Sequence, residues 1–319
     1  MAELQHKFVT TNGIRMHYVE QGAGPLVVLC HGWPESWYSY RHQIPALAAA
    51  GFRVVAPDQR GFGQTDRPEP IEAYNILNLA GDIVGLVNSL GVDSAAIVGH
   101  DWGAPVAWHC ALLRPDIFHA IALLSVPYLA RGTTHPAQAM QAMAGQDNFY
   151  QLYFQEPGKA EKELETDPRR AMAMLLYSLS GDAQPEEQWK FRFPKSMKFI
   201  DTGVVPRQLP PWLSEADLDF FAAEFKRAGF RGGLNWYRNA ERNWELTPFL
   251  DGAKLRQPAL FAAGSEDCVG KMYPGVFEMA GTFTPNLKKQ VIIPGAGHWT
   301  QQERPAEVNQ LLIEFLRSL

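Results

Sequence analysis

One acidic side chain, Asp101, lies between two glycines at the end of an apolar run in residues 97–103. Gly99 comes two residues before the acid and Gly103 two residues after it. This spacing is typical of a strained strand-to-helix turn, because glycines let strand and helix approach closely around a side chain that projects from the top of a sheet. A carboxylate there can attack a carbon atom and form an ester that water must later break. A simple tight turn is the alternative interpretation of this stretch alone.

An ester on Asp101 needs a general base, and histidine is the side chain suited to that role near neutral pH. Among 9 histidines, His298 stands out because it ends a Gly-Ala-Gly-His loop directly after a predicted strand. Ligands bind at that edge of open α/β sheets. Asp267 follows the preceding predicted strand and can accept the other ring N–H of His298, which fixes the tautomer. Glu266 is the alternative acid, and a surface loop is the alternative interpretation of His298.

Two backbone amides are candidates for an oxyanion hole. Residues 31–34, His-Gly-Trp-Pro, follow the third predicted strand, and Trp102 directly follows the candidate nucleophile. We expect the N–H groups of Trp33 and Trp102 to hold a developing oxyanion, although a plain Gly-Pro turn is the competing interpretation of residues 31–34. The chain order of nucleophile, acid and histidine is that of the α/β-hydrolases.

Strand and helix patterns alternate on both sides of a long interruption. A hairpin is predicted around Asn12-Gly13, and further strands are predicted at residues 26–30, 53–57, 95–98, 120–126, 258–263 and 289–293. Helices are predicted at residues 37–50, 79–90 and 308–316. Between about 131 and 245 no convincing strand is visible, and helical patterns occur at residues 169–179 and 215–228.

This alternation predicts an α/β-hydrolase fold, a mostly parallel sheet with helices on both faces and an inserted helical cap. We expect residues 1–130 to form the first part of the core, residues 131–245 the cap (lid), and residues 246–319 the second part of the core.

Composition argues against several classes of protein. The net charge of −5 and the lack of a basic cluster disfavour a nucleic-acid partner. No apolar run approaches the roughly 20 residues of a membrane span, and the first residues lack the apolar core of a signal peptide. The 3 cysteines are scattered without metal-type spacing, so we expect reduced thiols in a cytoplasmic protein.

The motifs resemble those of the soluble epoxide hydrolases, and the resemblance runs along most of the chain. Residues 31–38, HGWPESWY, resemble a loop of that family, although Phe is commoner there than Trp33. Residues 98–103 match its nucleophile motif. Residues 149–158, FYQLYFQEPG, and 229–239, GFRGGLNWYRN, resemble the cap of the mammalian soluble enzyme and its plant relatives.

This resemblance implies that Tyr150 and Tyr237 are the acids that assist ring opening. Tyr153 is not one of them, because the family's tyrosine lies four residues before the Phe of Phe-Gln-Glu-Pro. The chemistry agrees: an opening epoxide becomes a strongly basic alkoxide, and phenols with a pKa near 10 are protonated at pH 7 and can donate to it. We expect apolar substrate contacts from Trp102, Phe154, Trp236 and Trp299.

The sequence therefore predicts an enzyme that converts apolar aryl, alkyl or fatty-acid epoxides to vicinal diols through an ester on Asp101. Water activated by the His298–Asp267 pair hydrolyses the ester. The expected partners are the epoxide and water, with no metal or organic cofactor, in a monomer or homodimer that serves detoxification or lipid-epoxide turnover.

A haloalkane or haloacid dehalogenase shares this machinery, but it needs hydrogen-bond donors that hold a halide ion, to which Trp102 could belong, rather than paired tyrosines. A non-catalytic binding protein on this fold is the other alternative, whereas an esterase would need serine at position 101.

Overall fold

The computed structural model describes residues 3–319, and its main feature is one sheet of eight strands in the order β1-β2-β4-β3-β5-β6-β9-β10. The strands are β1 (Gln5–Thr11), β2 (Ile14–Gln21), β3 (Leu26–Cys30), β4 (Arg53–Pro57), β5 (Ala95–His100), β6 (Phe118–Leu124), β9 (Ala259–Gly264) and β10 (Leu287–Ile293). The predicted hairpin joins β1 to β2, and β2 also pairs antiparallel with β4. All the other neighbours in this sheet are parallel.

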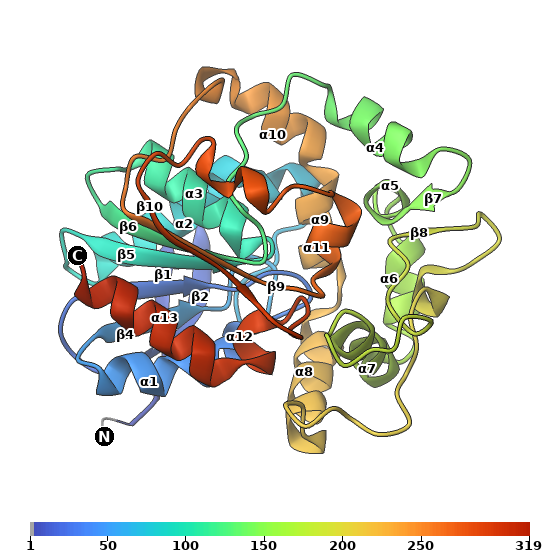
Figure 1. The fold of residues 1–319 in the computed structure, drawn as a ribbon, viewed down its shortest axis with the longest axis horizontal. Helices are drawn as coiled ribbons and strands as arrows, with labels where there is room; N and C mark the ends of the chain where they lie inside the picture. The colour runs from blue at the N-terminus through green and yellow to red at the C-terminus, as the bar shows by residue number, and fades with distance from the viewer. Residues whose placement is uncertain (1–2) are drawn as a thin grey trace.

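Helices cover both faces of the sheet, which explains why the central strands are apolar throughout. One face packs against α1 (Gln43–Ala49) and α13 (Pro305–Arg317), and the other packs against α2 (Ile76–Ser89) and α3 (Gly103–Leu113). Every residue of β3, β5 and β9 is buried. Figure 1 shows α1 and α13 side by side, as their contacts also require. This arrangement is the predicted α/β sheet.

The long insertion lies between β6 and β9 and gathers on one side of the sheet, at the right of Figure 1. Its helices are α4 (Pro136–Ala144), α5 (Tyr150–Tyr153), α6 (Lys159–Leu164), α7 (Pro168–Ser178), α8 (Glu215–Ala228), α9 (Arg231–Arg238) and α10 (Ala240–Leu246). The expectation of no strand in this region is wrong in one detail, because β7 (Asn148–Phe149) pairs with β8 (Arg192–Phe193). Two-residue strands are too short to leave an alternating pattern in a sequence.

The helix expected over residues 37–50 is divided into a 3₁₀ turn, η1 (Trp37–Tyr40), and α1. Pro45 lies in the first turn of α1, where its missing N–H costs nothing, whereas one continuous helix would place it in the interior. The other 3₁₀ turns are η2 (Ile71–Tyr74), η3 (Phe199–Asp201), η4 (Pro248–Leu250) and η5 (Glu278–Gly281).

The parallel strands end at one edge of the sheet, beneath the insertion, and the loops that leave them carry the candidate site. Two short helices begin there, α11 (Cys268–Met272) after β9 and α12 (Thr300–Glu303) after β10. Over the described part of the chain, no helix combines the length and the apolar character that crossing a membrane requires.

Candidate active site

Asp101 sits in the turn between β5 and α3 with a backbone φ of 49°. A residue other than glycine in this left-handed region is strained, and such strain concentrates at functional sites. The flanking glycines explain how the turn closes. A Cβ on Gly99 would collide with the backbone of Gly103, and one on Gly103 would collide with the carbonyl of Cys30. The predicted strand–turn–helix is present, with its strain at the acid itself.

The loop after β3 meets the Asp101 carboxylate directly. The backbone N–H of Trp33 donates to Asp101 Oδ1 at 2.8 Å, and a Cβ on Gly32 would collide with the same carboxylate. Trp102 is the N-cap residue of α3, so its amide belongs to the positive end of that helix. Burial alone would raise the pKa of Asp101, but His298, His100 and the Trp33 amide together lower it. The carboxylate is therefore ionised, and the Trp33 amide holds it in position.

His298 lies between the two predicted acids. Its Nδ1–H donates to Asp267 Oδ1 at 3.1 Å, and its Nε2 lies 3.4 Å from Asp101 Oδ2. Asp267 is also the N-cap residue of α11, where it accepts from the amide of Val269. Glu266 instead points away and pairs with Lys271 at 2.9 Å. The structure thus places Asp267, and not Glu266, against the histidine.

The pKa of His298 depends on the charges around it. Burial by itself would lower this pKa, but the Cys268 thiol when it is ionised, and the carboxylates of Asp267 and Asp101, raise it well above 6.5. An ester on Asp101 would remove the charge of this carboxylate and its interaction with the ring. The pKa of His298 would then fall, because one of the groups that raised it would be neutralised. At neutral pH a larger fraction of the ring would then be unprotonated, and only the unprotonated ring can accept a proton.

The two predicted tyrosines come from the insertion and share a cavity of about 250 Å³ with Asp101. Tyr150 is the first residue of α5, Tyr237 lies in α9, and their ring centroids are 5.8 Å apart. Burial raises the pKa of both phenols well above 10, so both keep their protons. Tyr153 instead donates to Glu163. The hydroxyl groups of Tyr150 and Tyr237 are therefore hydrogen-bond donors that an oxygen bound over Asp101 can reach.

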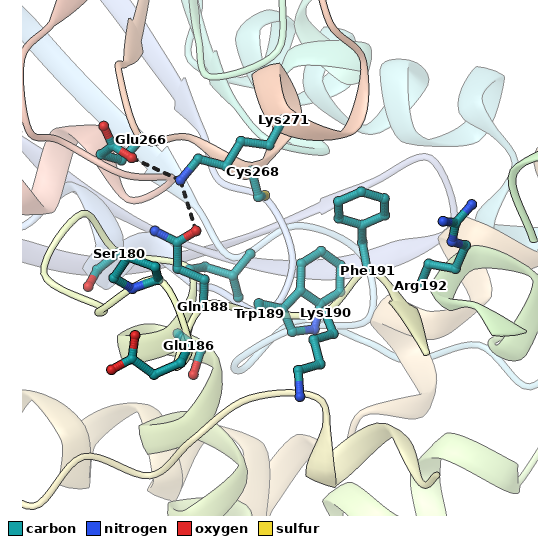
Figure 2. Close-up of a pocket in the computed structure, with 13 residues that line it drawn as sticks. Ser180, Glu186, Gln188, Trp189, Lys190, Phe191, Arg192, Glu266, Cys268 and Lys271 are labelled. Atoms are coloured by element: carbon teal, nitrogen blue, oxygen red, sulfur yellow. Dashed lines mark hydrogen bonds and ion pairs between the residues drawn. The ribbon is translucent and has the colours of Figure 1, made fainter. Parts of the chain in front are cut away.

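A second cavity adjoins the first, and a third adjoins the second. An inner one of about 40 Å³ contains Asp101, His298, both tyrosines and Trp299. An outer one of about 570 Å³ shares Leu179, Trp189 and Cys268 with the inner one. Figure 2 shows this outer cavity, where Lys271 reaches both Glu266 and Gln188.

The aromatic residues expected to contact substrate fall into two groups. Trp102 and Trp299 line the cavities. Phe154 and Trp236 are fully buried behind them and line none of the three. The ring of Phe154 lies 5.1 Å from that of Tyr237. The indole N–H of Trp236 donates to the carbonyl of Arg60. In this structure both support the walls of the site rather than form them.

Three other buried residues stand at the site without having been predicted. His100 Nδ1 lies 2.9 Å from Glu35, and His100 Nε2 donates to the carbonyl of His298 at 2.7 Å. Ser125 Oγ lies 3.0 Å from His298 Nδ1, and Ser125 has a φ of 69°. His100 and Glu35 lie inside two of the motifs described above, so their positions in the sequence could have identified them as site residues. Ser125 follows a strand without any motif.

Glu303 joins the insertion to the histidine loop. Its buried carboxylate accepts three backbone N–H groups, from Gly181 at 2.9 Å, Gly297 at 2.8 Å and Trp299 at 2.9 Å. Gly297 and Trp299 flank His298, while Gly181 follows α7. One carboxylate therefore fixes both sides of the candidate base and ties them to the insertion.

Glu303→Gln is expected to change how stability depends on pH. Burial, with a contribution from Asp182, raises the pKa of Glu303 to about 7 in spite of its three amide donors. The unfolded value is about 4.3, so the folded chain binds this proton more tightly, and the stabilisation is lost as pH rises through 7. Glutamine does not titrate. Between pH 6 and pH 8 the melting temperature of the wild-type protein should therefore fall further than that of the variant. Equal falls in the two proteins would contradict this assignment.

Comparison with known proteins gives one consistent result. Residues 25–305 match the family model described as alpha/beta hydrolase fold. The chain is 47% identical over 315 residues to epoxide hydrolase A of Mycobacterium tuberculosis, covering 98% of this chain and 97% of that protein. The crystal structure of epoxide hydrolase A from Mycobacterium thermoresistibile matches with a TM-score of 0.93 and 50% identity, over 99% of this chain and 98% of that one. An epoxide hydrolase from an endophytic Streptomyces matches with a TM-score of 0.95 and 45% identity, over 98% and 95% of the two chains. The chain belongs to the epoxide hydrolases of the alpha/beta hydrolase fold.

Proposed function

We propose that this protein opens apolar epoxides by attack of Asp101 on a ring carbon, with Tyr150 and Tyr237 donating to the ring oxygen. The observation that carries the proposal is the 250 Å³ cavity, in which an ionised carboxylate faces two protonated phenols. Breakage of the C–O bond leaves negative charge on the epoxide oxygen, and a proton from a phenol neutralises it. The product of this half-reaction is a hydroxyalkyl ester on Asp101.

In the second half-reaction His298 takes a proton from water, which attacks the carbonyl carbon of the Asp101 ester. Asp267 holds the ring through Nδ1, so that Nε2 faces the ester. The Trp33 amide, already 2.8 Å from Oδ1, is positioned to stabilise the oxyanion, and the Trp102 amide is the proposed second donor. As the tetrahedral intermediate collapses, the imidazolium gives its proton to the departing alkoxide, which leaves as a vicinal diol. The proton of the new carboxyl group replaces the one that the phenol donated, so Asp101, His298 and the tyrosine all return to their starting states.

Paired tyrosines favour this chemistry over that of a dehalogenase, which expels halide and has no alkoxide to protonate. Tyr150→Phe and Tyr237→Phe are therefore expected to slow ring opening by about 10²-fold each, the lower end of a general-acid contribution. The measurement is the single-turnover rate of ester formation with an aryl epoxide. Tyr153→Phe is the matched control, because Tyr153 bonds to Glu163 instead. Unchanged rates in both variants, together with halide release from a haloalkane, would support the dehalogenase instead.

The substrate class follows from the walls of the cavity. Leu129, Val269, Met272 and Val276 line this cavity and carry no hydrogen-bonding group on their side chains. Such a surface favours aryl and alkyl arms over polar ones. Residues 131–245 serve in this proposal as the cap that supplies the phenols and excludes water from the ester.

We further expect a monomer or a homodimer in the cytoplasm. All 3 cysteines are free thiols, and Cys30 and Cys110 are buried. Light scattering of the purified protein measures the first expectation, and fractionation of the source cells measures the second.

A further inference from the structure

Cys268 is a free thiol at the edge of the candidate active site. It is the first residue of α11, directly after Asp267. Its side chain lines both the inner cavity, which holds His298, and the outer cavity of Figure 2. A small ion that enters the outer cavity therefore reaches the sulfur without crossing the apolar cavity where the epoxide is expected.

Two other metal-binding groups lie beside this thiol. One ligand atom from each of Asp267, Cys268 and His298 lies within 4.8 Å of the other two. Asp267 and His298 are buried, at 1% and 3% exposure, so this is not a chance cluster of surface acids. Within residues 3–319, Asp267 Oδ2 has no hydrogen-bond partner. A buried carboxylate oxygen left in this state is an available ligand for a cation.

The donor set selects the kind of ion. Thiolate sulfur, imidazole nitrogen and carboxylate oxygen are the ligands of zinc, whereas magnesium and calcium prefer oxygen alone. Three protein ligands leave a fourth position for water. Atoms bound to one tetrahedral zinc ion lie about 3.3–3.8 Å apart, as bond lengths of about 2.0–2.3 Å require. The three ligand atoms lie within 4.8 Å of one another, so zinc binding requires the side chains to rotate and bring these atoms closer together.

Alkylation of the thiol is the competing use of Cys268. Burial is the main reason why the pKa of Cys268 is raised, so the sulfur keeps its proton at neutral pH and is a poor nucleophile. A bound metal ion removes that proton directly, with its release to solvent and no change of oxidation state. The thiol is therefore better suited to hold a metal ion than to react with an electrophile.

We propose that Asp267, Cys268 and His298 bind zinc, or another thiophilic divalent cation, as an inhibitory site. The expectation that bound zinc inhibits the enzyme rests on the proposed function of His298 as the base. A ring nitrogen bound to zinc has no lone pair for a proton, and the other nitrogen then carries a hydrogen. Water cannot be activated, so the ester on Asp101 persists while zinc is bound.

Binding of zinc itself is the first test, and it does not depend on activity. Calorimetric titration of the chelator-treated full chain should give one zinc ion per chain. Cys268→Ser should bind on the order of 100-fold more weakly. Glu266→Gln is the matched control, because this neighbouring acid pairs with Lys271 and should leave zinc affinity unchanged. Cobalt bound to the wild-type protein should show a thiolate-to-metal charge-transfer band that Cys268→Ser lacks, and equal zinc affinity in both proteins would overturn the site.

Inhibition is the second test. Zinc at about ten times the wild-type dissociation constant, which fills most of the wild-type sites and few of those in a variant that binds on the order of 100-fold more weakly, should cause an ester to accumulate on the wild-type protein during incubation with an aryl epoxide. At that zinc concentration Cys268→Ser should continue to turn over at its own zinc-free rate. Equal inhibition of the two proteins would contradict the proposal. Failure of the proposed function itself is distinguishable, because the calorimetric and cobalt results would stand while no ester formed under any condition.

Discussion

Asp101→Asn is expected to abolish epoxide turnover, with a loss of kcat on the order of 10⁶-fold, the scale seen when a covalent nucleophile is removed. The amide has no negative charge and cannot form the ester. Asparagine suits the position otherwise, because it tolerates a positive φ such as the 49° of Asp101 and can still accept from the Trp33 amide. Steady-state diol formation measures the effect.

A control separates loss of the nucleophile from loss of the fold. Asp116→Asn changes an exposed acid that pairs with Arg114, and it should leave turnover unchanged. Circular dichroism and the melting temperature of Asp101→Asn should be close to those of the wild-type protein. Substantial residual turnover in a folded Asp101→Asn, confirmed by mass to have kept its amide, would mean that water attacks the epoxide without a covalent intermediate.

His298→Gln is expected to stop catalysis halfway. In the proposed mechanism, ring opening needs Asp101 and the phenols, whereas hydrolysis of the ester needs a base. Removal of the base should therefore slow ester hydrolysis by roughly 10²–10⁴-fold, with a smaller effect on ester formation. The expected time course is consumption of about one equivalent of epoxide per chain, followed by very slow turnover.

The matched control for this variant is His119→Gln, an exposed histidine at the start of β6. It should turn over at the wild-type rate. If His298→Gln consumed no epoxide even in the first equivalent, His298 would be required for ring opening, and the division of roles between the two half-reactions would be wrong.

Local chemistry allowed much of the site to be predicted from the sequence. Positions 99 and 103 must be glycine because a Cβ at either would collide with neighbouring backbone. A requirement of this kind places glycines at fixed distances from Asp101, and that spacing can be recognised in the sequence. Asp267 follows the buried strand β9 and His298 follows its parallel neighbour β10, so the common edge of the two strands brings these residues together. Residues placed by element order and turn chemistry are accessible to sequence reasoning.

Residues placed by tertiary packing were not accessible in this way. Ser125 reaches His298 only because β6 and β9 are neighbours in the sheet. Glu303 meets Gly181 across 122 positions of the chain. Phe154 and Trp236 lie in motifs close to the two tyrosines, yet their side chains pack behind the cavity walls. A motif indicates where the backbone runs, but it does not determine which side chain of a helix faces the ligand.

The intact mass of His298→Gln after incubation with a trans-aryl epoxide tests the central claim most directly. The covalent mechanism predicts a mass increase equal to the whole epoxide, because attack by Asp101 adds every atom of the substrate and expels none. Peptide mapping should place the added mass on the segment that contains Asp101. No adduct from the epoxide, with one instead from a haloalkane that has lost its halide, would contradict the assignment and identify a dehalogenase.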